Sequence, residues 1–410
     1  MKIPDFVSRG PSRGLLLGVA FFSAALTATT VATRGGLSYI NLDSLLHDPR
    51  WFFTLLVLSA TVAAASVVTA TLPPVVTINV VVLVCLLGLL ETGAWLLAPA
   101  RPVISGEPEA VEKSAFYVPD ATLGYVMAPS TSARHRRIVD GRQIYDVFYR
   151  TDPWGRRETP TRGGHARSSF LLFFGDSNMF GEGLSQTETL PYYAGEIASA
   201  FRPYNYGVSG WGPSHLLGLA RRSRFRQEVA ERDGYAIFFL IPAHIDRVVG
   251  SSKVSAGWGR HFPYFRENAR GDLITDGDFV HGRPFTTLAY FIWTKSNLAN
   301  CFEVDLPLWY GASDYWLTAK VFKESSQLLA RQLSLRGFVV VLGQAYDDVQ
   351  RRAVHKYRDA LARERVPYLD YTELFDTRDV RYRLSETDYH NSALANRIIA
   401  TRLIADLVGR

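Results

Sequence analysis

The chain has 410 residues, of which 47% are hydrophobic and 20% charged, and its formal net charge is +6. The two cysteines, Cys85 and Cys301, are too few for a disulfide framework, and neither has the spaced partners of a metal site. The modest positive charge comes without a nucleic-acid-binding motif, a Gly-rich phosphate loop or a His-Glu-x-x-His zinc helix. We therefore expect no metal, no cofactor and no nucleic-acid partner.

Nearly all the long apolar segments lie before residue 100. Three runs with almost no charge, 14–33, 51–72 and 75–98, each approach the roughly 20 residues that a helix needs to cross a bilayer. We expect three transmembrane helices, although the first run, which basic residues precede, is alternatively a secretory signal. Those basic residues favour a cytoplasmic start, so three crossings would place everything after residue 100 outside the cytoplasm.

Glu91 is the one acidic residue well inside the third of these runs. Carboxylates inside a membrane are functional candidates by default. A residue about one turn past the middle of its helix can equally reach the interface or bond a neighbouring helix. Both interpretations stay open at this point.

Proline, glycine and several charges in residues 101–118 predict a linker. Asp140-Gly141 then predicts a hairpin turn between alternating segments, so we expect a small β preface that ends by residue 167. Two basic runs, at 134–137 and 221–226, predict a solvated face close to anionic lipid or, alternatively, a site for an acidic glycan.

From residue 168 onward the pattern becomes strand, loop and helix, repeated. The predicted strands are 170–174, 236–241, 337–342 and 366–369, with a weaker one at 203–206. The predicted helices are 214–231, 315–335, 347–364 and 392–408. Such alternation forms a parallel sheet with helices on both faces. We therefore predict a three-layer α/β/α sandwich over residues 168–410.

The alternation stops over residues 250–313, where an aromatic-rich insertion carries a hairpin signal at Thr275-Asp-Gly277. Long insertions of this kind are often binding loops or lids. The aromatic side chains would either stack on sugar rings or pack a small core of the insertion itself. They are Trp258, Phe262, Tyr264, Phe265, Tyr290, Trp293 and Trp309.

The apolar run 170–174 ends abruptly at Gly175-Asp176-Ser177. A buried parallel strand delivers its last residues to the carboxyl edge of the sheet, where ligand sites of α/β proteins lie. Ser177 therefore sits where a nucleophile would sit, although a serine at a helix start is also a common cap.

A serine nucleophile requires a base and a group that orients the base. Near the carboxyl terminus, Asp388 and His390 precede the last predicted helix. In an extended segment, side chains two residues apart point the same way, so one loop can present both groups. We expect His390 to act as the base and Asp388 to orient it toward Ser177.

These motifs, in this order, resemble the SGNH or GDSL hydrolase family over residues 168–408. Gly175-Asp176-Ser177 is similar to the first block, which carries the nucleophile, and Asp388-Tyr-His390 is similar to the fifth, which carries acid and base. The segment 205–210 resembles the second block, so the resemblance implies oxyanion-hole N–H groups from Ser177 and Gly210. Asn178 and Trp211 are predicted to bind the substrate.

The third block departs from the family pattern, because the asparagine that completes the oxyanion hole is missing after the strand 236–241. We take His244 as its substitute donor. The nucleophile-elbow motif Gly-x-Ser-x-Gly is absent as well, and Ser209 imitates it only loosely as a minor rival nucleophile.

Membrane-anchored SGNH domains of bacterial envelopes are carbohydrate esterases and O-acetyltransferases. The resemblance implies an esterase or deacetylase on the periplasmic side of the bacterial inner membrane, with the bilayer and an envelope or exopolysaccharide glycan as partners. An O-acetyltransferase with the same triad is the alternative, and it would need a membrane partner or another extracytoplasmic source of the acyl group. A non-catalytic subunit of a polysaccharide export assembly is the third interpretation, since fold alone does not imply activity.

Overall fold

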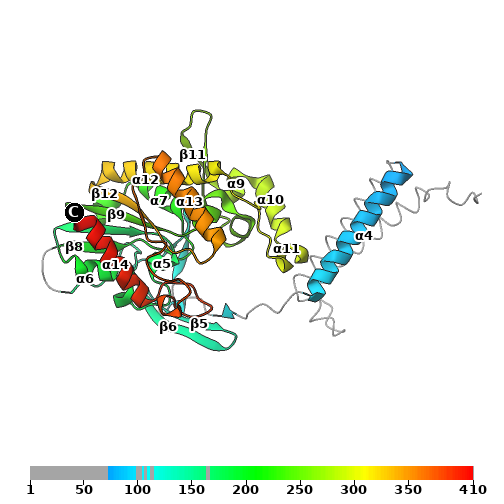
Figure 1. Cartoon of the computed structure of the whole chain (residues 1–410). Coiled ribbons are helices and arrows are strands. Elements are labelled where there is room, and N and C mark those ends of the chain that lie inside the picture. The colour runs from blue at the N-terminus through cyan, green and yellow to red at the C-terminus, as the bar shows by residue number, and fades with distance from the viewer. Residues whose placement is uncertain (1–72, 98–103, 106–108, 111–114, 163–166, 410) are drawn as a thin grey trace, which may run out of the picture. The chain divides into compact units, whose positions relative to one another are not determined.

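The computed structural model describes residues 73–97, 104–105, 109–110, 115–162 and 167–409. These residues fall into two compact units (Figure 1). The described residues before 100, together with 291–305, belong to the first unit. All other described residues belong to the second unit, which contains every motif of the predicted active site.

A five-stranded parallel sheet forms the centre of the second unit, with the strand order β13-β12-β9-β7-β8. Its strands are β7 (Ser169–Phe174), β8 (Phe201–Asn205), β9 (Asp233–Leu240), β12 (Ser334–Leu342) and β13 (Tyr368–Asp370). All five predicted strands are present within a few residues of their expected bounds. Every residue of β7 is buried, which explains why this strand reads as a continuous apolar run.

Helices cover both faces of the sheet, as predicted for a three-layer sandwich (Figure 1). The longer helices of this unit are α6 (Leu190–Ile197), α7 (Pro213–Arg222), α12 (Ala312–Gln332), α13 (Asp348–Arg363) and α14 (Ala393–Val408). Side chains of β7 alternate between the layers: Leu172 packs with α7, α12 and α13, whereas Leu171 and Phe173 pack with α6 and α14. Burial of each such side chain stabilises the fold by about 1.5–3 kcal/mol.

The helix predicted at 214–231 is instead two helices, α7 and α8 (Phe225–Glu228). Ser223 lies between them with φ +55°, a left-handed conformation that ends α7. The sequence analysis also missed α6, which begins after Thr189 because the Thr189 side chain caps it by accepting from Tyr192 N.

The predicted β preface is present and packs against the sandwich. Its strands are β1 (Ile104–Ser105), β2 (Glu109–Ala110), β3 (Tyr117–Asp120), β4 (Gly124–Met127), β5 (Ser132–Val139) and β6 (Arg142–Arg150). Asp140 and Gly141, with φ +47° and +77°, make the predicted tight turn between β5 and β6. Phe116 and Tyr149 share a buried cluster with Phe180, three residues after Ser177.

The insertion contains a hairpin of β10 (Pro263–Glu267) and β11 (Leu273–Asp278), followed by α9 (Phe279–Gly282), α10 (Pro284–Trp293) and α11 (Asn297–Cys301). Its predicted turn position was wrong, because Gly277 lies inside β11 and the chain reverses between Asn268 and Asp272. Its aromatic residues divide: Phe262 and Phe265 are buried, whereas Trp258 and Trp309 are exposed.

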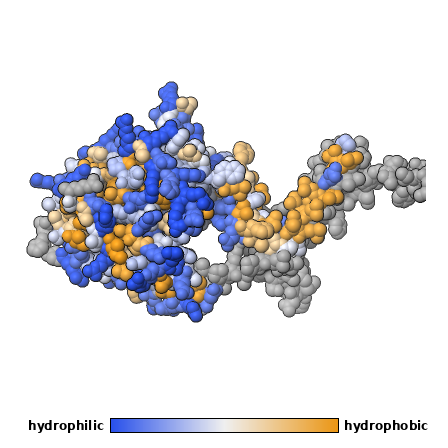
Figure 2. All heavy atoms as spheres, in the orientation of Figure 1, coloured by the Kyte–Doolittle hydropathy of each residue, from blue (hydrophilic) through white to orange (hydrophobic). Residues whose placement is uncertain are grey.

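Helix α4 (Pro74–Leu97) occupies the position of the predicted third membrane span and belongs to the first unit. About half of the surface of Leu83, Leu86 and Leu90 is exposed along this helix (Figure 2). The predicted spans 14–33 and 51–72 lie outside the described residues. Among the described residues, no helix has the length and apolarity needed to cross a membrane. The three-span arrangement stays a prediction.

Glu91, on α4, bonds a neighbouring helix of the same unit. Its carboxylate accepts hydrogen bonds from Ser296 Oγ, from Asn297 N at 2.6 Å and from Leu298 N at 3.4 Å. These donors form the first turn of α11, where a carboxylate is stabilised by unpaired N–H groups and by the helix dipole. Of the two interpretations of Glu91, the contact to a neighbouring helix is therefore the one seen.

Candidate active site

Ser177 stands where the buried strand β7 ends and the short helix α5 (Ser177–Phe180) begins. Gly175 makes the tight turn possible, because a Cβ there would lie only 2.9 Å from the Met179 side chain. The Asp176 side chain caps α5 by accepting a backbone N–H at 3.0 Å. The turn thus holds the serine hydroxyl at the carboxyl edge of the sheet.

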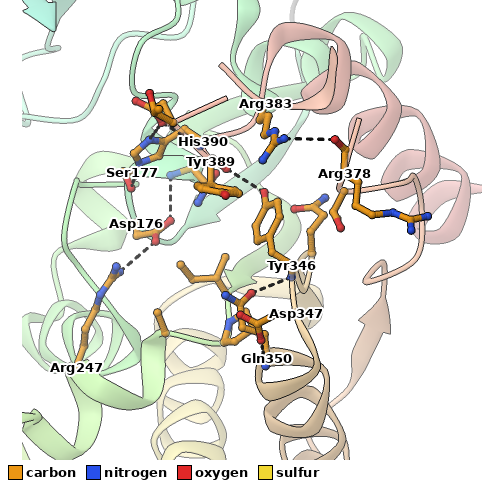
Figure 3. Close-up of a pocket in the computed structure, with 18 of the residues that line it drawn as sticks. Asp176, Ser177, Arg247, Tyr346, Asp347, Gln350, Arg378, Arg383, Tyr389 and His390 are labelled. Atoms are coloured by element: carbon orange, nitrogen blue, oxygen red, sulfur yellow. Dashed lines mark hydrogen bonds and ion pairs between the residues drawn. The ribbon is translucent and has the colours of Figure 1, made fainter. Parts of the chain in front are cut away.

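Three predicted side chains from opposite ends of this unit meet at that edge (Figure 3). Ser177 Oγ lies 2.8 Å from His390 Nε2, and His390 Nδ1 lies 2.6 Å from Asp388 Oδ1. Asp388 Oδ1 also accepts the His390 backbone N–H at 3.1 Å. In the neutral imidazole, Nδ1–H therefore donates to the carboxylate, which leaves Nε2 free to accept the serine proton.

The loop that carries His390 is fastened to the nucleophile turn. Asn391 N donates to Asn178 Oδ1 at 3.1 Å, and Leu384 N donates to His390 O at 3.0 Å. Asn178, a predicted substrate contact, also lines the cavity next to Ser177. Its amide therefore sets the spacing between the base loop and the nucleophile while facing the space that a substrate would occupy.

Arg137 and Glu182 surround the triad, and the sequence analysis assigned neither of them to it. Arg137, on β5 of the preface, lies 3.5 Å from Asp388 Oδ2 through its Nε and 3.7 Å from Glu182 Oε1 through its Nη1. Arg137 appeared in the sequence only as one member of a basic run. No spacing rule would connect it to Asp388, because the contact depends on how the preface packs.

The surroundings shift the pKa values of both titratable triad members. Burial acts to lower the His390 pKa, but the hydrogen bond to Asp388 and the negative charges of Glu182 and Asp388 outweigh it and hold the pKa above its ordinary value. Burial acts to raise the Asp388 pKa, but the bond to His390 and the Arg137 charge hold it below its ordinary value. Asp388 is therefore ionised at neutral pH and can stabilise the imidazolium.

His244 does not face the cavity, in contrast to its predicted role as an oxyanion donor. The residue is fully buried, and its Nδ1 accepts the Ile241 N–H at 3.1 Å. The proton therefore sits on Nε2, which faces Asp176 Oδ2 at 3.4 Å. Burial and the neighbouring Arg247 cation lower the His244 pKa, so the ring stays neutral at neutral pH.

Asp176 is the centre of a buried charge cluster that supports the nucleophile turn. Arg247 Nη1 donates to Asp176 Oδ2 at 3.1 Å and to Trp211 O at 2.5 Å. Burial acts to raise the Asp176 pKa, but His244 and Arg247 together hold it well below its usual range. His244 and Arg247 thus connect the Ser177 turn to the segment that follows β9.

Gly210 lies in a tight loop with φ +85°. Among the described residues, no acceptor pairs with the Gly210 N–H, whereas the Gly207 N–H already donates to Asn205 Oδ1 at 2.9 Å. Of the two glycines, only Gly210 keeps an N–H that could serve an oxyanion, although neither glycine lines the cavity, and its role as a donor stays a prediction. The rival nucleophile Ser209 donates to Glu182 Oε2 at 2.7 Å, and no histidine activates it within the described part of the chain.

Trp211, a predicted substrate contact, is buried and stacked on His215 instead. Its Nε1 donates to Tyr125 O at 3.2 Å, so both its ring and its polar atom are used inside the protein. The side chain does not line the cavity that holds the triad. Trp211 serves the packing of the preface against the sandwich.

A cavity of about 830 Å³ opens beside Ser177 and His390. It is lined by the β7, β9 and β12 ends and by the loop before α14, so it lies at the carboxyl edge of the sheet. Tyr346, Tyr389 and Arg383 are among the large side chains that line it (Figure 3). Within the described residues, no group of three or more His, Cys, Asp or Glu side chains is arranged to hold a metal ion.

No protein-family model matches the chain, and none of the curated proteins does. Among solved structures, a lipolytic protein of the G-D-S-L family from Veillonella parvula is 11% identical, with a TM-score of 0.33 over 59% of this chain and 99% of that one. A carbohydrate acetylesterase from Sinorhizobium meliloti is 10% identical, with a TM-score of 0.32 over 59% of this chain and 99% of that one. An acetyl xylan esterase from Butyrivibrio proteoclasticus is 10% identical, with a TM-score of 0.33 over 69% of this chain and 73% of that one. Similarity at this level supports no argument about chemistry, which depends here on the geometry of the triad.

Proposed function

We propose that this chain is a serine esterase of the SGNH hydrolase type that removes acyl groups, foremost acetyl groups, from a glycan. The observation that carries the proposal is the pair of short contacts that link Ser177 to His390 and His390 to Asp388, at 2.8 and 2.6 Å. Acyl transfer by a serine uses such a chain of hydrogen-bonded groups. A serine that only caps a helix would not need a histidine and an aspartate linked to its hydroxyl.

The reaction follows from these contacts. His390 Nε2 takes the Ser177 proton as Oγ attacks the ester carbonyl, and the N–H groups of Ser177 and Gly210 stabilise the oxyanion. The sugar alkoxide leaves with the proton from His390, which gives an acetyl-serine. Water, deprotonated by His390, then attacks this ester, and acetate departs as Ser177 regains its proton. Asp388 holds the ring and stabilises the imidazolium in both halves.

The choice of a glycan is supported by the size and lining of the cavity. A volume of about 830 Å³ exceeds what an acetyl group needs and has room for sugar units beside it. The exposed ring of Tyr389 and the neighbouring ring of Tyr346 provide flat faces next to the triad, which suit the C–H faces of a pyranose. A lipase would instead present a wall of aliphatic side chains.

We also propose that the region before residue 100 anchors the enzyme to the inner membrane, with the active site on the periplasmic side. The support comes from the three apolar runs of the sequence and from the basic residues that precede the first one. Separation of membrane and soluble fractions of cells that express the full chain tests the anchor. Recovery of the full chain in the soluble fraction would contradict it.

The esterase proposal is tested with the detergent-solubilised full chain. We expect a fluorophosphonate probe to label Ser177, and acetate to be released from an acetylated oligosaccharide, while the Ser177→Ala variant does neither. Absence of labelling in a folded sample would favour a non-catalytic subunit. If acetyl transfer to an added oligosaccharide exceeded acetate release, the O-acetyltransferase alternative would replace the esterase.

A further inference from the structure

Arg383 lies on the wall of the active-site cavity without an acidic partner among the described residues. It belongs to the loop that leads from the short helix η6 (Val380–Tyr382) to His390. Two arginines in and just before η6 are paired, Arg378 with Asp376 and Arg381 with Asp379. The Arg383 guanidinium makes one long hydrogen bond, from Nη2 to Arg378 O at 3.3 Å, and its buried Nε has no acceptor in the described part of the chain.

The other arginines that line the cavity already have acidic partners, and Arg378 is paired with Asp376. Arg247 pairs with Asp176, and Arg137 pairs with Asp388 and Glu182. The positive charges of Arg247 and Arg137 are therefore neutralised by carboxylates of the protein itself. Arg383 is left as a charge that the described residues do not neutralise.

A second unsatisfied donor faces the same cavity. Gln344, two residues after the end of β12, has 3% of its surface exposed, and its Nε2 has no acceptor among the described residues. Buried polar groups are nearly always hydrogen-bonded, so an unpaired amide at a cavity wall indicates a ligand atom that accepts from it. The one acid of the wall without a cationic partner in the described residues, Asp347, caps α13 by accepting Gln350 N at 2.7 Å. Gln344 Nε2 and Arg383 Nε are thus donors at this wall that lack an acceptor among the described residues.

Two tyrosine rings connect Arg383 to the triad. The Arg383 guanidinium lies 4.9 Å from the centre of the Tyr389 ring, and Tyr346 meets Tyr389 edge-on at 5.0 Å. Tyr346 OH donates to Tyr389 O at 2.9 Å, which fixes the pair (Figure 3). Because both rings line the same cavity as Ser177 and His390, a sugar against these rings would lie close to the reacting ester.

We propose that Arg383, Gln344 and the Tyr346–Tyr389 pair form a subsite for a carboxylate-bearing sugar, so that the glycan substrate is a polyuronate or another acidic polysaccharide. This inference rests on the proposed esterase function and names its substrate class. The planar guanidinium donates two parallel hydrogen bonds to a carboxylate, which a neutral sugar cannot accept in the same way. Gln344 donates to a ring or hydroxyl oxygen, and the tyrosine faces hold the sugar plane.

The test compares two O-acetylated oligosaccharides of equal length, an oligogalacturonate and a neutral xylo-oligosaccharide, on the full chain. We expect a higher kcat/KM for the oligogalacturonate and a preference that declines as ionic strength rises. Arg383→Gln should lower the ratio of the two kcat/KM values about ten-fold or more, because a hydrogen bond between charged groups is lost. Arg383→Lys should keep part of the ratio, since it keeps the charge and loses only the fork.

Arg381→Gln is the matched control, because Arg381 is an exposed arginine of the same loop that pairs with Asp379 and does not line the cavity. It should leave the ratio unchanged. Equal turnover of both substrates by the unmodified chain, or an equal ratio in Arg383→Gln, would overturn the acidic subsite and leave the esterase proposal standing.

Binding separates the two proposals further. Calorimetry of the Ser177→Ala full chain with unacetylated oligogalacturonate should detect binding that Arg383→Gln in the same background weakens by about ten-fold. A chain that hydrolyses neither ester but shows this binding would contradict the esterase and keep the subsite. Equal affinity for a sulfated neutral oligosaccharide would show a site for charge alone and overturn the carboxylate assignment.

Discussion

At His390, two opposing effects decide the proton affinity of the base. Burial favours the neutral ring, whereas the bond to Asp388 and the nearby acids favour the charged ring, and the acids win. The neutral form is the one that can take the Ser177 proton. The base is therefore available only above a pKa that lies higher than the ordinary 6.5.

The pH profile of kcat/KM on a small neutral ester should show this shift. As pH falls, activity should be lost through a midpoint above 6.5, because the protonated His390 cannot accept the serine proton. Asp388→Asn should move the midpoint downward, since the bond and charge that raise the pKa are gone, and should lower the rate roughly 10³-fold or more. A midpoint at or below 6.5 in the unmodified chain would contradict the assigned surroundings of His390.

Removal of the two central groups should have effects that do not add. Ser177→Ala and His390→Ala should each lower kcat by roughly 10³-fold or more, and the double variant should be no slower than the slower single variant. The reason is that the nucleophile and its base act as one unit. Kinetics of acetate release measure this, and multiplicative losses in the double variant would mean that the two residues work separately.

The structure brings the side chains of Ser177, Asp388 and His390 together where the sequence placed them, and their catalytic roles stay a prediction. Their positions were predictable because the chemistry requires those residue types and because strand ends and extended loops have known directions. The side chains of His244 and Trp211 lie away from the cavity for a physical reason. Their side chains are turned by partners, Asp176 and Tyr125, that come from distant parts of the chain.

At the scale of elements, the turn after β7 depends on an arginine that precedes the sandwich. Arg157 is almost completely buried, and its guanidinium donates to Phe180 O, Gly181 O and Leu184 O at 2.8, 2.6 and 2.5 Å. These carbonyls end α5 and begin the following loop, where no helical N–H reaches them. Burial lowers the Arg157 pKa to about 10, yet the group remains charged at neutral pH.

Arg157→Met should therefore destabilise the fold and disturb the nucleophile. Three hydrogen bonds from a charged donor would be lost, at a cost of about 3 kcal/mol, which corresponds to a thermal midpoint lower by roughly 5–10 °C. Leu184 O would keep no donor among the described residues, whereas Phe180 O would keep Asn205 Nδ2 and Gly181 O would keep Leu184 N. Fluorophosphonate labelling of Ser177 should slow as well. Arg162→Gln, which removes an exposed cation paired with Glu196, is the control and should change neither quantity. Equal midpoints in the two variants would mean that water satisfies these carbonyls.

Element types were predictable where periodicity is strong, as in the buried strands and the amphipathic helices α12 and α13. The ends of helices and strands, and the breaks within helices, were harder to predict from the sequence. Helix α7 ends at Ser223 because this residue has a left-handed backbone conformation, which serine seldom adopts. The chain reverses between Asn268 and Asp272 because the Asn268 side chain accepts hydrogen bonds from the backbone N–H groups of Arg270 and Asp272. Such local choices are decided by small energies that a pattern does not reveal.

At the scale of the molecule, the preface and the sandwich act together. Phe116 and Tyr149 of the preface pack on Phe180, Arg137 reaches Asp388, and Arg157 holds the end of α5. The boundary predicted at residue 168 therefore divides one compact unit.

Truncated fragments test whether the sandwich needs the preface in order to fold. A fragment of residues 101–410 should fold and be labelled by fluorophosphonate, because it keeps all six preface strands and their contacts with the sandwich. A fragment of residues 168–410 should be insoluble or unlabelled, since it exposes the Phe180 face and removes Arg137 and Arg157. Circular dichroism and labelling of both fragments give the answer, and an active 168–410 fragment would show that the preface is dispensable.

The sequence by itself determined the sandwich, the order of its strands along the chain and the three residues of the triad. It could do so because burial imposes a period and because acyl transfer demands particular functional groups. Only the tertiary structure decided which arginines surround the triad and where His244 and Trp211 point. It also decided that, among the described residues, Arg383 has no acidic partner and Gln344 Nε2 has no acceptor at the cavity wall. Those facts depend on contacts between segments far apart in the chain, and no local pattern encodes which distant side chain will meet a given charge.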